Sequence, residues 1–404
     1  MSTSPLAEHE RVNLMSPEVR ANPYPIYAAL RRDAPVVQVE PGGLWAVSRY
    51  EDVMHIYKNP KLYSVEGLRV AADPPWIGRN PFSSAMLFVD DPKQHARLRG
   101  AANRAFLPAA LARLEPFLRA TAEELTTHVV GRRTVDFIEA FALPMPARVI
   151  GALLGLDPSL NPRFMQWSDG IVAISASQPG DTERVAYCKR TVAEMEQYLG
   201  EVVAWRRKSP AQDLVSTLVQ ASGDEALTDT ELMGFLFLML VAGLETTMHL
   251  LGHSARLLAE HPDVLARLRA ERSLIPAFIE EVLRFEPPVQ ATMRMCTEDV
   301  TLAGVTVPRG NVLMALMGSA MRDERYTPEA EHFRLDRKGP HNLGFGHGMH
   351  FCLGASLARL EARVALETLI PRCEGLALRP EPIEWNVSMT VRGMRNLPLE
   401  VHPA

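Results

Sequence analysis

Cysteine is scarce in this 404-residue chain, forms no Cys-x-x-Cys pair, and occurs only at Cys188, Cys296, Cys352 and Cys373. The lack of paired cysteines excludes a zinc ribbon and a dithiol redox motif. Three of the four are interpreted as small buried hydrophobic residues. Cys352 differs because it lies in an unusual glycine-rich setting. The sequence also lacks internal repeats and low-complexity segments.

Long apolar runs and an excess of basic residues are also missing. The longest apolar run covers residues 235–243, much shorter than the ~20 residues that a membrane-spanning helix needs. Residues 1–25 lack the basic stretch and apolar run of a signal peptide. The net charge is −5, which does not favour nucleic-acid binding. We therefore expect a cytoplasmic protein with no membrane anchor and no nucleic-acid partner.

The pattern of apolar residues predicts a mainly α fold with a minor β part. The clearest helix runs from Thr228 to Glu260, where Thr228 and Glu231 form a capping box and His261-Pro262 ends the helix. Its middle is apolar on all sides, which predicts a buried helix. Residues 67–91, rich in proline and apolar side chains, predict an irregular binding loop. We expect a single domain over residues 1–404, with β-rich parts at 30–65, 295–320 and 375–404.

The segment Phe345–Gly354 is the most informative. Gly346 and Gly348 permit a tight turn, and Cys352 is expected to open a helix, whose free N–H groups stabilise a thiolate. The segment resembles the haem-binding loop of the cytochromes P-450, Phe-Gly-x-Gly-x-His-x-Cys-x-Gly, at every defined position. The resemblance implies haem b with the Cys352 thiolate as axial iron ligand, held beside Phe345, Gly346 and Gly354. It also implies that the haem lies between the long central helix and the helix that follows the cysteine loop.

Two further motifs carry the same resemblance. Glu281 and Arg284 are spaced to share a helix face, and in this family such a pair binds a later arginine, here Arg337, as structural support for the haem loop. In Ala242–Thr247, a glycine, a carboxylate and threonines interrupt an apolar helix, which suggests a functional site. The resemblance makes Ala242 a haem contact, and Glu245 and Thr246 the acid and alcohol that pass protons to dioxygen. Glu245 replaces the commoner aspartate.

Positively charged partners for the haem propionates can be placed by the same resemblance. His95 and Arg99 are four residues apart and share one helix face. Arg294 follows the Glu-x-x-Arg helix, and His350 precedes the cysteine by two residues. A competing signal is the pair His249 and His253, which has a metal-ligand spacing. Because a leucine stands where a zinc protease motif needs glutamate, both are interpreted as ordinary, partly buried histidines.

The resemblance implies a monooxygenase that hydroxylates a hydrophobic small molecule, such as a terpenoid, steroid or fatty compound. Electrons would come from a ferredoxin and its reductase, since no flavin or nicotinamide fingerprint is present; Arg97, Arg104, Arg337 or Lys338 are candidate contacts. We expect a monomer. Two alternatives stay open: a peroxide-driven or non-oxygenating enzyme of the same fold, and a non-catalytic haem or redox-sensing protein. The expected substrate-pocket residues are mostly apolar: Leu68, Trp76, Ile77, Phe82, Met86, Leu238, Val241, Ala242, Val289, Gln290, Thr292, Thr390 and Val391.

Overall fold

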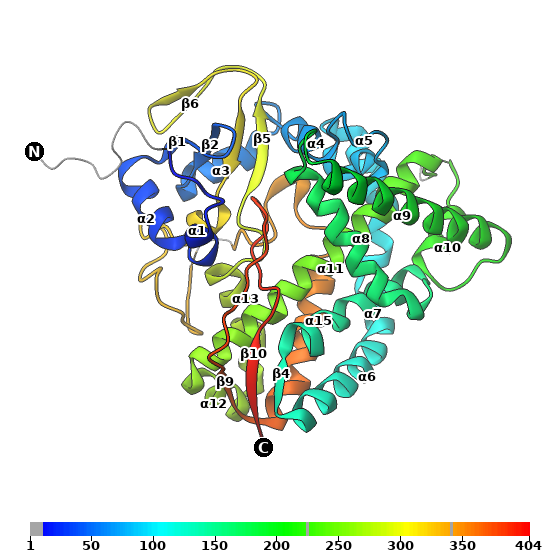
Figure 1. Cartoon of the computed structure of the whole chain (residues 1–404), viewed down its shortest axis with the longest axis vertical. Helices are drawn as coiled ribbons and strands as arrows, with labels where there is room; N and C mark the ends of the chain where they lie inside the picture. Colours follow the sequence, from blue (N-terminus) through cyan, green and yellow to red (C-terminus); the bar gives the residue numbers. More distant parts are fainter. Residues whose placement is uncertain (1–10, 224–225, 340–341) are drawn as a thin grey trace, which may run out of the picture. The chain divides into compact units, whose positions relative to one another are not determined.

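The computed structural model describes residues 11–223, 226–339 and 342–404 (Figure 1). Residues 1–10, part of the segment used to argue against a signal peptide, lie outside this range. The chain forms two compact units. Unit 1 comprises Met1–Leu68, Glu280–Cys352 and Trp385–Gly393, and unit 2 comprises Arg69–Ile279, Leu353–Glu384 and Met394–Ala404. The prediction of a single domain stays a prediction.

Unit 1 is built on a five-stranded sheet with strand order β1-β2-β8-β5-β3. β2 and β8 pair in parallel, and the other neighbours pair antiparallel. Successive side chains point to opposite faces of the sheet, and both faces carry an apolar core: Val47, Leu313 and Ala315 belong to one, and Ala46 and Met314 to the other. The elements of unit 1 are α1 (Pro17–Ala21), α2 (Tyr24–Asp33), β1 (Val36–Val39), β2 (Leu44–Val47), α3 (Tyr50–Lys58), β3 (Tyr63–Ser64), β5 (Thr292–Cys296), β6 (Val300–Leu302), β7 (Val305–Val307), β8 (Val312–Ala315) and α14 (Met317–Ala320).

Unit 2 is mainly helical and carries a three-stranded sheet of order β4-β10-β9. The chain passes between the units within α4 (Glu66–Ala72) and α13 (Ile275–Phe285). The elements of unit 2 are α5 (Pro92–Asn103), α6 (Pro108–Arg132), β4 (Thr134–Asp136), α7 (Pro144–Leu154), α8 (Asn161–Val172), α9 (Thr182–Lys208), α10 (Leu214–Val219), α11 (Asp229–Glu260), α12 (Pro262–Ala270), α15 (Ala355–Leu369), β9 (Cys373–Leu378) and β10 (Pro398–Pro403).

The long helix α11 is the central element of unit 2 and confirms the predicted capping box. Thr228 accepts from the Glu231 N–H, and the Glu231 carboxylate accepts from the Thr228 N–H. The helix is long and apolar enough to cross a membrane by length and composition, but 83% of its most apolar window is buried inside the protein. That burial is typical of a core helix. α8 and α7 pack against it in unit 2.

Two local predictions need correction. Residues 67–91 are not irregular throughout, since they contain most of α4 and two short 3₁₀ turns, Pro81–Ser84 and Met86–Phe88. The strand β4, which lies in a part predicted to be helical, was missed. Its three residues are too few for an alternating pattern to be recognised, and its pairing partner β10 is more than 250 residues away.

Candidate functional site

The loop that carries Cys352 is shaped by two glycines in the left-handed region. Gly346 and Gly348 have φ angles of 73° and 74°, which residues with a Cβ rarely adopt. The turn is closed by a hydrogen bond of 2.9 Å from the Cys352 N–H to the Phe345 carbonyl oxygen. Contrary to the prediction, Cys352 does not open a helix, because α15 begins at Ala355 and is preceded by a Gly354 cap. The thiol therefore belongs to the loop.

Cys352 is also the only one of the four cysteines that is not buried. Burial raises the pKa of the Cys188 thiol, and it raises the pKa values of Cys296 and Cys373 to about 11 in each case. Those three therefore stay protonated and fit the interpretation as small hydrophobic residues. A Cβ placed on Gly354 would meet no atom within 4 Å, so the backbone beside Cys352 is open to a flat ligand.

Behind the loop, the structure brings Glu281, Arg284 and Arg337 together in unit 1. Arg284 donates two hydrogen bonds to the Glu281 carboxylate, at 2.7 and 2.8 Å, and Arg337 donates a third at 3.1 Å. The three side chains are between 4% and 9% exposed. Arg284 and Arg337 also donate to backbone carbonyls of residues 328–332. A buried carboxylate is thus fully paired, and it fixes the chain segment that leads toward Cys352.

The middle of α11 differs from the rest of that buried helix. Ala242 is exposed, and Gly243 and Thr246 are partly exposed, whereas the neighbouring residues are buried. Residues 242 and 246 share a helix face, so this face opens locally. The Thr246 hydroxyl donates a hydrogen bond to the Ala242 carbonyl oxygen at 2.6 Å. This carbonyl oxygen, which lies at the opening, therefore already has a partner. Glu245 is only 7% exposed and belongs to the same turn of the helix.

Glu245 has charged neighbours that the sequence did not reveal. His249, one turn along α11, places Nε2 3.6 Å from Glu245 Oε1. Asp169 on α8 has a raised carboxyl pKa, first because protein atoms remove water from it and then because Glu245 carries the same charge. Arg395 and His249 act in the opposite direction. Asp169 and Arg395 are separated from Glu245 by long stretches of chain, so no spacing rule could have found them.

The four candidate propionate partners occur in two pairs, one in each unit. In unit 2, His95 and Arg99 lie on α5; burial and the Arg99 charge lower the pKa of the His95 imidazole. In unit 1, Arg294 lies on β5 and is 7% exposed, and His350 ends the 3₁₀ turn Gly348–His350. His95 and Arg294 are buried, and Arg99 and His350 are partly exposed. The role of these four residues toward the propionates stays a prediction.

The expected pocket residues fall into separate groups. In unit 1, Val289 and Val391 form an antiparallel bridge, so the segments 289–292 and 390–391 lie side by side. Gln290 is buried, and its amide donates to the Pro287 carbonyl oxygen and the Tyr24 hydroxyl, so it is held in the protein interior. Leu68 packs on the core of the same unit.

In unit 2, the turns of residues 81–88 pack on α11. A Cβ on Gly234 would lie only 2.7 Å from the Ser84 carbonyl carbon, so this glycine allows the close approach. Phe82 packs edge to face on Phe88. Trp76 donates its indole N–H to the Ser177 hydroxyl. Ile77 and Met86 are buried, as are Leu238 and Val241 on α11.

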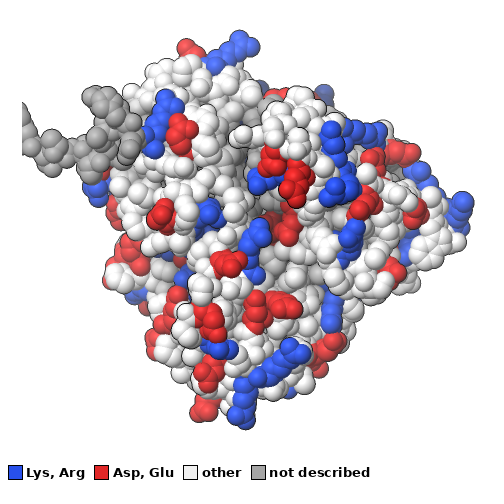
Figure 2. Space-filling view, viewed as in Figure 1, with Lys and Arg blue, Asp and Glu red and all other residues white. Residues whose placement is uncertain are grey.

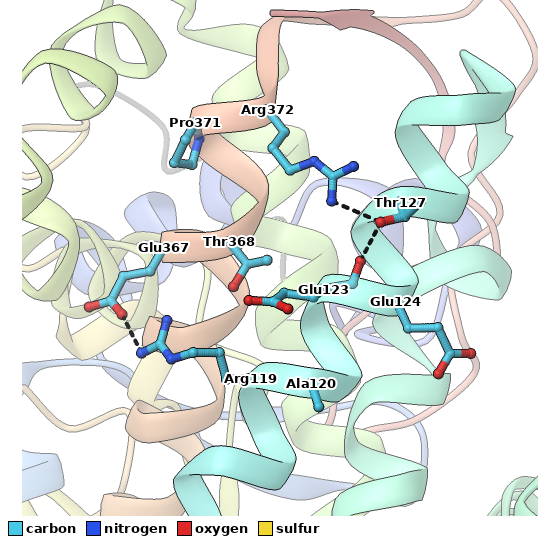
Figure 3. Close-up of a pocket in the computed structure, with 9 residues that line it drawn as sticks. All are labelled: Arg119, Ala120, Glu123, Glu124, Thr127, Glu367, Thr368, Pro371 and Arg372. Atoms are coloured by element: carbon cyan, nitrogen blue, oxygen red, sulfur yellow. Dashed lines mark hydrogen bonds and ion pairs between the residues drawn. The ribbon is translucent and has the colours of Figure 1, made fainter.

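A depression in unit 2 lies between α6 and α15, and Figure 3 shows its lining. Arg119 pairs with Glu367 at 3.2 Å, and Arg372 donates to the Thr127 hydroxyl at 2.8 Å. The charged groups therefore bind one another across the depression. We interpret these contacts as helix packing. On the face drawn in Figure 2, basic and acidic side chains alternate, and neither sign forms a continuous area.

The candidate contacts for an electron partner differ in availability. Arg337 is excluded, because it is bound to Glu281 and largely buried. Arg97 forms an ion pair with Glu231. Arg104 and Lys338 are exposed.

A mainly helical fold and an accessible cysteine on a glycine loop are the features of a haem-thiolate oxidoreductase. The sequence model described as cytochrome P450 matches residues 36–384, and the chain belongs to the cytochrome P450 family. The mainly α fold with a minor β part, and haem b with cysteine ligation as the cofactor, are thereby confirmed. Members of this family are monooxygenases, and so the enzyme class is an oxidoreductase.

Individual relatives are similar over nearly the whole chain. Vitamin D(3) 25-hydroxylase of Pseudonocardia autotrophica is 34% identical, and the match covers 98% of this chain and 97% of that protein. Among solved structures, cytochrome P450 CYP109Q5 from Chondromyces apiculatus is 36% identical with a TM-score of 0.88, covering 98% of this chain and 99% of that one. CYP109E1 from Bacillus megaterium, solved in complex with testosterone, is 34% identical with a TM-score of 0.86, covering 95% and 99%.

Proposed function

We propose that this enzyme hydroxylates a hydrophobic small molecule of the steroid, terpenoid or fatty class, using dioxygen and electrons from a ferredoxin and its reductase. The observation that carries the proposal is the opened turn of α11. There, Glu245 is buried next to the partly exposed Thr246. An acid and an alcohol at one accessible turn are suited to moving protons.

The chain's own residues would hold the haem as follows. Cys352 supplies the thiolate ligand, and Phe345, Gly346, Gly354 and Ala242 are the proposed contacts of the ring. His95, Arg99, Arg294 and His350 are proposed to bind the propionates, through charge-assisted hydrogen bonds worth roughly 1.5–3 kcal/mol each. The Glu281–Arg284–Arg337 trio keeps the preceding segment in place. When bound, the haem supplies the redox chemistry that activates dioxygen, and thiolate ligation favours O–O cleavage.

Glu245 and Thr246 are the proposed catalytic pair. Thr246 Oγ1 is at a site accessible from outside the helix, where it can donate a hydrogen bond to dioxygen. In the structure this hydroxyl donates to the Ala242 carbonyl oxygen instead, so a rotation about χ1 would redirect it. Glu245, the neighbouring acid, then returns a proton to the Thr246 hydroxyl. A peroxide-driven enzyme would have no need of this pair.

Two relatives support a hydrophobic, steroid-like substrate. One of them is named vitamin D(3) 25-hydroxylase, and another was solved with testosterone. The candidate pocket residues agree in chemistry, because apart from Gln290, Thr292 and Thr390 they are apolar. Apolar pocket walls favour apolar ligands, because burying apolar surface is favourable by about 25 cal/mol per Å². A charged small acid would find no matching group among them. We further propose a monomeric, cytoplasmic enzyme.

The test is a spectral titration followed by turnover. Purified protein is titrated with testosterone, a monoterpene and a fatty acid while the Soret band is followed. Bound compounds are then incubated with a bacterial ferredoxin, its reductase and a nicotinamide donor, and products are identified by mass spectrometry. Hydroxylated product that requires the ferredoxin supports the proposal. Product formed only when hydrogen peroxide replaces the electron donors would favour the peroxygenase alternative instead.

A further inference from the structure

His249 on α11 lies beside Glu245 in a buried position that the proposed mechanism does not yet use. Its side chain is 2% exposed, and Nε2 lies 3.6 Å from Glu245 Oε1. Neither ring nitrogen has a hydrogen-bond partner in the part of the chain that the structure describes. A buried imidazole without partners is unfavourable, because its polar nitrogens have lost water and gained no hydrogen bond in return. A small rotation of either side chain would bring Nε2 within hydrogen-bond distance of the carboxylate.

A further charged group, Asp169, lies within electrostatic range of Glu245 and His249. Asp169 on α8 retains an exposed side chain, although nearby protein atoms remove enough water to raise its carboxyl pKa. Both Glu245 and His249 influence that pKa, so the three groups are within electrostatic range of one another. Their solvent exposure decreases toward the interior: Asp169 is exposed, Glu245 is 7% exposed and His249 is 1% exposed.

We propose that His249 is a positioning residue for the catalytic pair, which donates its Nε2–H to Glu245 and connects that carboxylate with Asp169. This inference rests on the proposed role of Glu245. In each cycle, Glu245 releases one proton toward Thr246 and regains one from water by way of Asp169. His249 keeps its Nε2–H throughout and holds the Glu245 carboxylate in place.

Within the described residues, four charged or titratable groups can be placed near His249. Glu245 and His253 lie on its own helix, Asp169 comes from α8, and Arg395 precedes β10. Tyr187 on α9 responds to the charge of Asp169.

The test compares three variants of the full-length holoenzyme. His249→Phe removes the donor and keeps a ring of similar size. His249→Gln keeps an amide donor that does not titrate. His253→Phe is the matched control, since it makes the same change on the same helix about 12 Å from Glu245. Coupling, the hydroxylated product formed per pair of electrons consumed, is measured across the neutral pH range.

We expect His249→Phe to lower coupling by at least about tenfold, because the acid of the catalytic pair is no longer held in place, with hydrogen peroxide formed instead. His249→Gln, which keeps a hydrogen-bond donor, should retain most of the coupling. His253→Phe should behave as the parent protein does. Parent-like coupling in His249→Phe, or a loss of coupling in His249→Gln as large as that in His249→Phe, would overturn the proposal.

A second readout needs neither substrate nor an electron partner protein. Carbon monoxide bound to the chemically reduced protein has an infrared stretching band that responds to nearby charges and hydrogen bonds. His249→Phe should shift this band, and His253→Phe should not. An equal band in both variants contradicts the role of His249. Absence of hydroxylation by the parent protein would instead contradict the proposed function, so the two failures are distinguishable.

Discussion

Arg284 and Arg337 bind the same carboxylate, Glu281, from two directions. Arg284 comes from the helix that also carries Glu281, and Arg337 comes from the segment that leads to the Cys352 loop. The Glu281 oxygen that Arg337 contacts also accepts the Arg334 N–H at 2.9 Å. The buried Glu281 carboxylate thus joins its own helix to the segment that carries Arg334 and Arg337 and leads to the Cys352 loop. Removal of this carboxylate should therefore disturb the position of Cys352.

Glu281→Gln tests this link. The change leaves two buried guanidinium groups without their anion, and breaking a buried pair costs roughly 3–5 kcal/mol. We expect loss of bound haem after purification, measured by the ratio of Soret to protein absorbance, and a lower melting temperature. The control is Glu324→Gln, which removes an exposed carboxylate from a salt bridge with Arg31. An unchanged haem content in Glu281→Gln would contradict the structural role.

Cys352→Ser tests the iron ligand. A serine hydroxyl does not supply the thiolate, so the reduced carbon monoxide complex should lose its red-shifted Soret band. Cys373→Ser is the matched control, because Cys373 is buried and its thiol pKa is raised to about 11. Retention of the red-shifted band in Cys352→Ser would require a different ligand.

Thr246→Ala tests the alcohol of the catalytic pair. Without the hydroxyl, protons reach dioxygen less effectively, so electrons should be diverted to hydrogen peroxide and coupling should fall about tenfold. Substrate binding, followed by spectral titration, should change little. Thr247→Ala, one residue along and buried, serves as the control. Equal coupling in parent and Thr246→Ala would argue for the peroxygenase or non-oxygenating alternative.

Glu361 on α15 predicts a pH dependence of stability. It is buried, and desolvation raises its carboxyl pKa to about 8. Since this value lies above that of an unfolded glutamate, about 4.3, the folded state binds the proton more tightly. The contribution of Glu361 to stability is therefore present below pH ~4.3 and is lost progressively as the pH rises toward 8.

Glu361→Gln should consequently raise the free energy of unfolding at pH 7, by an amount on the order of 3 kcal/mol. Chemical denaturation at several pH values measures this effect, which should vanish near pH 4. Glu123→Gln, on the exposed face of α6, should change little at any pH. A lower stability of Glu361→Gln at pH 7 would mean that the carboxylate is ionised and paired.

Gly234→Ala tests the contact between α11 and residues 81–88. The added Cβ would lie 2.7 Å from the Ser84 carbonyl carbon, so the turn must move away from the helix. We expect destabilisation of about 1–3 kcal/mol and weaker substrate binding by spectral titration. Gly200→Ala on α9, where a Cβ meets nothing within 4 Å, should bind substrate normally. Normal binding by Gly234→Ala would show that this turn does not shape the pocket.

The sequence predicted those parts of the fold that depend on local chemistry. The capping box of Thr228 and Glu231 needs only residues three apart, and the turn at Gly346 and Gly348 needs only glycine. Long-range arrangement was not accessible in the same way. The strand β4 was missed because its partner β10 lies at the far end of the chain.

The candidate site shows the same division. Glu245 was found because a carboxylate inside an apolar helix breaks a local rule. Asp169 was not found, because an aspartate on an amphipathic helix is ordinary, and only the packing of α8 on α11 brings it near Glu245. His249 was noticed for its spacing to His253, but its contact with Glu245 depends on which way each ring turns. The helix onset after Cys352 was placed too early, because Gly354 caps the helix.

Each unit also includes residues beyond position 384. Unit 1 includes Trp385–Gly393, where Arg392 donates to the backbone carbonyl oxygens of Arg20 and Ala21 in the last turn of α1. Unit 2 includes β10, the middle strand of its sheet. During synthesis, unit 1 has all of these segments only after Trp385–Gly393 has been made, and unit 2 only after Met394–Ala404 has been made. The nascent protein must therefore keep its apolar helices from aggregating until these residues have been synthesised.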